Sequence, residues 1–154
     1  METPKYFFQY RDDAQKLFLR EYVYALGTFH YNWHDEIELL VILRGRADIC
    51  TGGCVYQLEE DDMILINSNE GHATLARSAD CLAFLIRFSP TVFEAYDANY
   101  RALRFQLLTD SSSRAQLPYR LLRMYMTKML LAMETDEQKN LLQMQSGLYP
   151  LLEL

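Results

Sequence analysis

Short segments rich in Val, Ile, Leu, Tyr and Phe recur through residues 17–88 every 8 to 12 residues or so, with turn-forming residues between them. Each segment has the length of one short strand, and a series of such strands predicts a sandwich or a barrel. Because the connections are tight, strands adjacent in sequence should be antiparallel neighbours in space. The expected strands are Leu17–Leu26, Glu36–Leu43, Arg46–Thr51, Cys54–Leu58, Met63–Ile66, His72–Arg77 and Cys81–Phe88.

The segments that flank this β region follow different patterns. Residues 1–16 contain Pro4 and a cluster of aromatic residues, and two interpretations stay open: an arm that lies across the barrel, or a frayed terminus. After the last strand, Ser89 and Pro90 favour the start of a short helix near 90–96. Leu103–Leu108 is a candidate for one more strand.

The C-terminal part of the chain predicts two helices. The first begins at Pro118 and runs to about Met133, and a capping box, Thr135-x-x-Gln138, begins the second. We therefore expect an antiparallel helical pair after the β unit.

The first of these helices has apolar residues on more than one face. Leu121 and Met129 belong to its broad apolar stripe, whereas Met124 and Leu131 fall on the otherwise polar side. Either the helix buries one face on the β unit and offers a second surface to another protein, or these are ordinary scattered surface residues.

Composition excludes several classes of function. The formal charge of −6 disfavours nucleic-acid binding by this chain alone. The apolar runs are far shorter than the roughly 20 residues of a membrane-spanning helix, and the N-terminus lacks the layout of a signal peptide. If Gly52 and Gly53 form a two-residue hairpin turn, Cys50 and Cys54 point to opposite faces, which favours free thiols and an intracellular protein.

The candidate site is a group of polar residues around two of the three histidines. Asn32, His34 and Glu38 occupy even positions, so in an extended strand their side chains share one face. His72 begins a later strand, and the curvature of a barrel can bring it opposite that group.

These residues resemble the motifs of the cupin superfamily. The first cupin motif, H-x-H-x3-E-x6-G, is matched by Asn32-x-His34-x3-Glu38-x6-Gly45, with Asn at the place of the first histidine. The second motif, roughly G-D-x4-P-x3-H, is matched within LEEDDMILINSNEGH, which ends at His72. In that match, Asp61 stands where Gly is usual, which the tolerance of Asp for left-handed backbone makes plausible.

The phrases WHDEIELLVILRG, LEEDDMILINSNEGH and LIRFSP, in this order, are similar to the sensor domains of AraC-type transcription regulators. The resemblance implies a cupin-like antiparallel β-barrel (a double-stranded β-helix or jelly roll) over 17–109 that binds a small-molecule effector. It also implies that the helices of 115–154 form the contact of a homodimer, with Leu121, Met124, Met129 and Leu131 at the interface. DNA would be bound only by a helix-turn-helix domain after residue 154, so we expect the chain to be truncated before it.

Three interpretations of His34, Glu38 and His72 remain open. As metal ligands they form a set of two histidines and one carboxylate, suited to Fe(II) or another divalent ion in an oxygenase or isomerase. As pocket residues they offer hydrogen bonds to a sugar or similar polar metabolite. They can also simply hydrogen-bond to one another at the barrel mouth. Asn32 in place of a histidine weakens the metal interpretation.

Two further residues are candidates for ligand binding. An inward Arg87 would select a carboxylate or a hydroxyl-rich ligand, whereas an outward one would only be solvated. Tyr24 can stack on a sugar ring, as can Tyr22, which has the same parity on the first strand, although Tyr is common in half-buried strands. The sequence thus predicts a cytoplasmic bacterial effector-sensing and dimerisation domain without catalytic residues or a cofactor, and a metal-dependent small cupin enzyme is the alternative.

Overall fold

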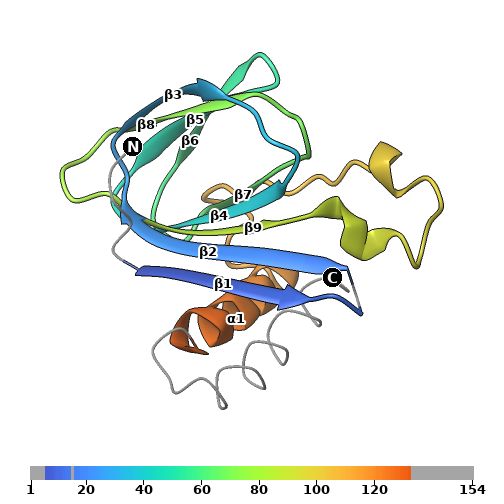
Figure 1. The fold of residues 1–154 in the computed structure, drawn as a ribbon. Helices are drawn as coiled ribbons and strands as arrows, with labels where there is room; N and C mark the ends of the chain where they lie inside the picture. Colours follow the sequence, from blue (N-terminus) through green and yellow to red (C-terminus); the bar gives the residue numbers. More distant parts are fainter. Residues whose placement is uncertain (1–5, 15, 133–154) are drawn as a thin grey trace. The chain divides into compact units, whose positions relative to one another are not determined.

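The computed structural model describes residues 6–14 and 16–132. The chain divides into two compact units, Met1–Leu108 and Thr109–Leu154, and we describe each by itself. Figure 1 shows the course of the chain.

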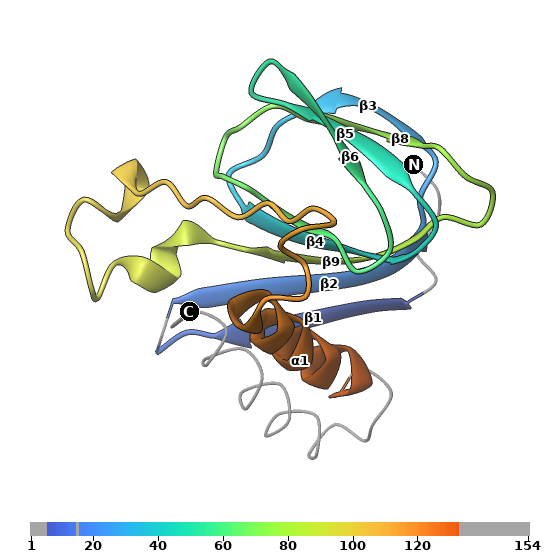
Figure 2. The same cartoon turned by 180° about the vertical axis from the view of Figure 1, so that it is seen from behind.

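The first unit is built from nine strands in two antiparallel sheets. One sheet has the order β1-β2-β9-β4-β7 and the other β3-β8-β5-β6, and the two face each other in Figures 1 and 2. The strands are β1 (Tyr6–Asp12), β2 (Leu17–Ala25), β3 (Thr28–Asn32), β4 (Ile37–Arg44), β5 (Ala47–Thr51), β6 (Cys54–Leu58), β7 (Met63–Ile66), β8 (His72–Ala76) and β9 (Leu82–Phe88).

The sheet topology corrects the prediction of a closed barrel. Each sheet keeps two edges in the described part of the chain, and no ladder joins the two sheets. Strand spacing predicts sandwiches and barrels alike, because both bury alternate residues of short antiparallel strands. The mostly β, antiparallel class was predicted correctly.

Several local predictions are confirmed. Gly52 and Gly53 form the hairpin turn, and Cys50 lies opposite Val55. The described cysteines are all free thiols. Asp61 has a φ of 71°, in agreement with its position in the place of a glycine.

The N-terminal segment and β3 differ from expectation. Tyr6–Asp12 is the edge strand β1, paired with β2 in register from Tyr6 to Asp12, and is neither a separate arm nor a frayed end. No strand was expected over Thr28–Asn32, but this segment is β3 and pairs with β8. Both segments are short and lie at sheet edges, where burial imposes little alternation on the sequence.

The helical predictions are only partly confirmed. Ser89 caps a 3₁₀ helix that covers Pro90–Phe93 and does not reach Tyr96. Leu103–Leu108 forms no strand beyond a single bridge between Leu108 and Ile64. In the second unit, α1 spans Leu117–Ala132, as predicted. It is the one α-helix of the described residues, and the predicted partner helix from Thr135 onward lies outside them.

The core of the first unit lies between the two sheets. It joins Leu40 and Ile42 of β4 to Ile49 of β5 and to Leu85 of β9, all at most 3% exposed. A row of apolar side chains on the opposite face of the five-stranded sheet is also buried, including Leu39. No helix of the described residues is both long and apolar enough to cross a membrane.

One buried residue on that opposite face has an ionisable side chain. Glu21 of β2 is completely buried, and neither of its carboxylate oxygens has a hydrogen-bond partner within residues 6–14 and 16–132. Burial raises the pKa of Glu21 to about 8, so the carboxyl group is mostly neutral at pH 7.

Gly45 directly follows β4, at a place where the chain passes close to the connection between β8 and β9. Its φ is +88°, and an added Cβ would lie 2.5 Å from Ser78 Oγ and 3.0 Å from the Cα of Cys81. We therefore expect Gly45→Ala to lower the free energy of unfolding by about 3 kcal/mol in urea denaturation. Gly53→Ala is the matched control: its φ is +77°, but nothing lies within 4 Å of the added Cβ, so only the backbone strain of about 1 kcal/mol applies. Equal losses for both variants would contradict the steric argument.

Candidate functional site

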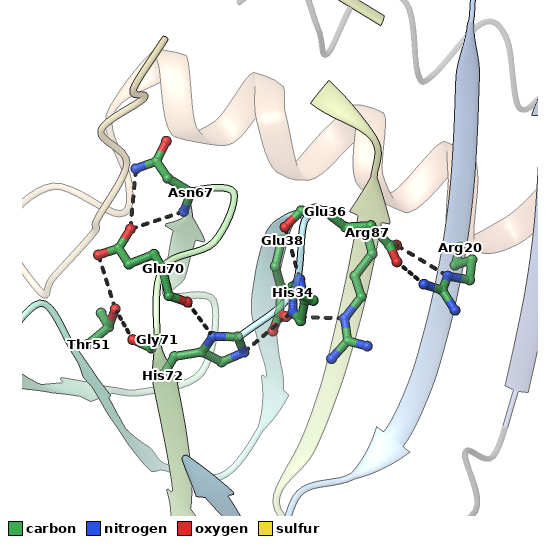
Figure 3. Close-up of polar contacts among 10 residues, drawn as sticks. All are labelled: Arg20, His34, Glu36, Glu38, Thr51, Asn67, Glu70, Gly71, His72 and Arg87. Atoms are coloured by element: carbon green, nitrogen blue, oxygen red, sulfur yellow. Dashed lines mark hydrogen bonds and ion pairs between the residues drawn. The ribbon is translucent and has the colours of Figure 1, made fainter. Parts of the chain in front are cut away.

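Four side chains from both sheets meet in one buried cluster, shown in Figure 3. His34 lies in the connection between β3 and β4, Glu38 is the second residue of β4, His72 begins β8 and Arg87 lies on β9. Glu38 and Arg87 are directly opposite each other in the β4·β9 ladder, so their side chains share one face of the five-stranded sheet. We call these four residues the His–Glu–Arg cluster.

A single carboxylate oxygen is the centre of this cluster. Glu38 Oε2 lies 3.0 Å from His34 Nε2, 3.3 Å from His72 Nε2 and 3.2 Å from Arg87 Nε. The two imidazole rings meet edge to face, with centroids 5.1 Å apart. Glu38 is only 2% exposed, so its charge depends on these three neighbours for compensation.

The other nitrogen of each histidine fixes the proton arrangement. His34 Nδ1 lies 3.0 Å from the carbonyl oxygen of Glu36, and His72 Nδ1 lies 3.1 Å from that of Glu70. A carbonyl oxygen can only accept, so each Nδ1 carries a proton and donates it. Each Nε2 then either carries a second proton, which makes the ring cationic and lets it donate to Glu38, or is an open lone pair able to bind a cation.

The pKa values follow from this geometry. Burial alone would raise the pKa of Glu38, but the hydrogen bonds from His34 and His72 and the charge of Arg87 hold it at about 2. For His72, burial disfavours the imidazolium, yet the hydrogen bond to Glu38 and its negative charge raise the pKa above the usual value. The carboxylate is therefore ionised, and His72 is drawn toward its charged form.

The loop between β7 and β8 holds His72 in place through Glu70. Glu70 accepts hydrogen bonds from the hydroxyl group of Thr51 at 3.1 Å and from the backbone N–H of Asn67 at 3.1 Å. At the preceding position, the N–H of Asn69 donates to the carbonyl oxygen of His34 at 2.8 Å, which links the β7–β8 loop to the β3–β4 connection. The cluster is thus supported from both sheets.

The side chain of Asn67 attaches a further segment to this loop. Its Nδ2 donates to the carbonyl oxygen of Phe105 at 2.9 Å, and its Oδ1 accepts from the N–H of Phe105 at 2.8 Å. The N–H of Leu65 on β7 donates to the carbonyl oxygen of Leu107 at 3.0 Å. Residues 105–108 therefore run along β7 without forming a regular strand.

Three residues of the cluster could hold a divalent metal ion. His34, Glu38 and His72 each offer one ligand atom, and these atoms lie within 4.8 Å of one another. Nδ1 donation to backbone carbonyl groups orients both Nε2 atoms as metal-binding histidines require. A bound cation would share Glu38 Oε2 with the N–H of Arg87. The positive charge of Arg87 would repel the cation, which weakens such a site.

Not all predicted site residues join the cluster. Arg87 points inward, which answers the question that the sequence left open. Asn32 is the last residue of β3 and lies opposite His72 in the β3·β8 ladder, but it is exposed. The side chain of Tyr24 lies outside the described residues.

The four residues predicted at a dimer interface differ in exposure. On α1, Met124 and Leu131 are exposed, Leu121 is half-buried, and Met129 is completely buried. Met129 therefore offers no surface to a second chain, whereas Met124 and Leu131 do.

Three further residues neighbour the cluster, and Arg20 is the one that sequence reasoning missed. The guanidinium group of Arg87 lies 5.5 Å from the centroid of the Tyr22 ring. Arg20 is directly opposite Arg87 in the β2·β9 ladder, and its Nε donates to Glu36 Oε2 at 3.2 Å. Arg20 and Tyr22 share parity in the sequence, which was the available signal, but the register that brings them to Arg87 could not be known without the ladder.

The family model of the AraC-like ligand binding domain matches residues 16–152. The chain therefore belongs to this family of ligand-binding domains. A sequence search of the curated proteins finds no match.

Solved structures with a similar course of chain include cupins. A conserved protein of unknown function from Streptococcus pyogenes is 20% identical, with 57% of this chain and 74% of that chain covered and a TM-score of 0.46. The cupin domain of an XRE family transcriptional regulator from Enterobacter cloacae is 17% identical (54% and 93% covered, TM-score 0.43). The cupin domain of Cnp3 from Schizosaccharomyces pombe is 8% identical (54% and 62% covered, TM-score 0.45). All three TM-scores are below 0.5, and we draw no functional conclusion from them.

Proposed function

We propose that this chain is the effector-binding domain of a bacterial AraC-type transcription regulator and that the His–Glu–Arg cluster binds a small polar metabolite. The observation that carries the proposal is the convergence of three donor side chains on one buried oxygen of Glu38, next to an apolar core that the two sheets share. An apolar surround with few, well-placed polar groups is typical of small-molecule sites.

The chemistry of the cluster favours a ligand with several hydroxyl groups, such as a sugar. A hydroxyl group both donates and accepts, so it can donate to the carboxylate of Glu38 and accept from the N–H groups of Arg87 or from His34. His34 and Arg87 are each nearly a fifth exposed, which leaves both accessible to a ligand, whereas Glu38 and His72 are enclosed. The ligand would therefore enter past His34 and Arg87.

Regulation follows if the ligand binds two arrangements of the protein with different affinities. The difference would bias the position of a DNA-binding domain joined after the helices. Dimerisation through 115–154, with Met124 and Leu131 in the contact, and a cytoplasmic location belong to the same proposal. Both Met124 and Leu131 are exposed in the single chain, which supports a role at an interface.

The second candidate function is that of a metal-dependent small cupin enzyme. It is favoured by one observation, the two histidines and one carboxylate with both Nε2 atoms directed at Glu38. A divalent ion held by these residues would act as a Lewis acid or activate oxygen or water. His34, Glu38 and His72 would hold it, and Arg87 would orient a substrate carboxylate or hydroxyl group next to it.

A ligand screen tests the proposed function. The purified chain is heated with pentoses, hexoses, alditols and hydroxy acids, and at least one compound is expected to raise the melting temperature by several degrees, because a ligand at 100 times its Kd adds about 2.7 kcal/mol. His34→Gln should abolish this rise, since it removes an accessible donor of the cluster. Arg44→Gln is the control and should leave the rise unchanged, because Arg44 lies at the far end of β4 from the cluster and donates to the carbonyl oxygen of Asp80.

Two results would contradict the effector proposal. One is a thermal response that His34→Gln and the control Arg44→Gln reduce equally. The other is stoichiometric Fe, Mn, Ni or Zn in protein purified without chelator and lost in the double variant His34→Ala/His72→Ala, which would support the enzyme instead.

A further inference from the structure

A cavity opens on β1 and β2, beside the His–Glu–Arg cluster. Its volume is about 420 Å³. The residues that line it include Gln9, Arg11, Phe18, Arg20, Glu36 and Ser89. We call it the β1–β2 pocket.

The pocket and the cluster share one face of the five-stranded sheet. Gln9 lies opposite Arg20, Arg20 opposite Arg87, and Arg87 opposite Glu38. Residues directly opposite on neighbouring strands point to the same side, so these four side chains form one row across β1, β2, β9 and β4. With strands about 4.8 Å apart, the row is about 14 Å long.

Positive charge exceeds negative charge along the pocket wall. Arg11 and Arg20 line it together with one carboxylate, that of Glu36. Arg20 donates to Glu36, and Arg11 donates through Nε to Asp13. A guanidinium group has five N–H donors, more than a single carboxylate can accept, so both arginines retain donors for a ligand. With Asp13 counted, the two arginines are matched by two carboxylates, so an anion would be held by these remaining N–H donors.

An aromatic ring forms the apolar part of the same wall. Phe18 is 43% exposed although it is a large hydrophobic residue, and the guanidinium group of Arg11 lies 4.5 Å from its ring centroid. The ring and the cation together present a surface for a molecule that has an apolar body and an anionic end.

We infer that the β1–β2 pocket is a binding site for the anionic group, a carboxylate or a phosphate, of a small organic molecule whose apolar body contacts Phe18. Arg11 and Arg20 receive the anion through forked N–H donors, and Gln9 adds a neutral donor. The inference deepens the proposed function, on which it rests: the pocket would take the anionic end of an effector that reaches toward Glu38. It is testable separately, because the pocket residues are not those of the cluster.

Isothermal titration of the full chain with benzoate and with phenyl phosphate tests the inference, and benzyl alcohol is the neutral probe of the same shape. At least one anion is expected to bind at least about tenfold more tightly than benzyl alcohol. Arg11→Gln and Arg20→Gln should each weaken this binding about tenfold, the loss of one charge-assisted hydrogen bond. Arg44→Gln is the control and should change it less than twofold, because Arg44 lies at the far end of β4 and donates to the carbonyl oxygen of Asp80.

The outcomes separate carboxylate from phosphate and pocket from cluster. Tighter binding of benzoate assigns the site to carboxylates, and tighter binding of phenyl phosphate assigns it to phosphates. The inference is wrong if neither anion binds, if benzyl alcohol binds equally well, or if Arg44→Gln weakens binding as much as Arg11→Gln does. Because the side chain of Arg11 is 64% exposed, Arg11→Gln keeps the test valid even if Arg20→Gln fails to fold.

His34→Gln distinguishes this inference from the proposed function. Anion binding that is lost in His34→Gln and unaffected by Arg11→Gln would place the anion in the cluster, which overturns the inference and leaves the effector proposal standing. Anion binding that depends on Arg11 and Arg20, with no metabolite of the screen binding at the cluster, would support the pocket and contradict the effector proposal.

Discussion

Glu38→Gln should lower the free energy of unfolding by about 3 kcal/mol and the melting temperature by roughly 10 °C. The substitution removes the one negative charge that Arg87 and the two histidines share. His72 can lose a proton in response, but Arg87 cannot, so an uncompensated cation remains in a largely buried place. Urea denaturation followed by circular dichroism measures the loss.

Glu94→Gln is the control for this prediction. Glu94 also forms an ion pair, with Lys16 at 2.9 Å, but both side chains are more than two fifths exposed. Its loss should cost less than about 1 kcal/mol. The double variant Glu38→Leu/Arg87→Met should lose less than the sum of its single variants, because it removes the cation together with its partner. Additive losses would mean that Glu38 and Arg87 do not stabilise each other.

Glu21→Leu should stabilise the protein, by about 3 kcal/mol at pH 7. The pKa of this carboxyl group is about 8 in the folded chain and ordinarily 4.5, so the unfolded chain loses the proton at a lower pH than the folded chain does. Above pH 4.5 the group therefore destabilises the fold, and the penalty grows until the pH reaches about 8. Leucine removes this penalty at a site that is already completely buried.

The pH dependence distinguishes ionisation from simple packing. The stability difference between Glu21→Leu and the natural chain should grow by about 2 kcal/mol from pH 5 to pH 7. Glu21→Gln serves as the control, because the amide keeps the size and the buried polar group but does not titrate. A difference between Glu21→Leu and the natural chain that is constant with pH would show that the carboxyl group does not titrate as described.

The sequence predicted the centre of the site better than its surroundings. The spacing of His34 and Glu38, together with His72 at the start of a strand, was enough to expect the three side chains to meet, because the tight turns leave few ways to pair the strands. Arg87 was identified, but its direction depends on the β4·β9 register, which places it opposite Glu38. Asn32 lies opposite His72, but its exposure at the end of β3 could not be read from the parity of the sequence.

The contribution of the N-terminal strand could not be predicted. The alternation in residues 6–12 is too weak to specify a strand at the edge of a sheet, where only one neighbour constrains it. Without β1, neither Arg11 nor the β1–β2 pocket has a place in the fold. The sequence pattern likewise gave no sign that Glu21 would be buried without a partner, because its neighbours in sequence are those of an ordinary half-exposed strand.

The attachment of residues 105–108 to β7 has a consequence for solubility. β7 is the last strand of its sheet, and an uncovered strand of that kind offers its backbone groups to other molecules. Here the N–H of Leu65 is taken by Leu107, and the side chain of Asn67 takes both backbone groups of Phe105. Residues 105–108 thus cover the β7 edge of the sheet and hinder intermolecular strand pairing, the first step toward aggregation.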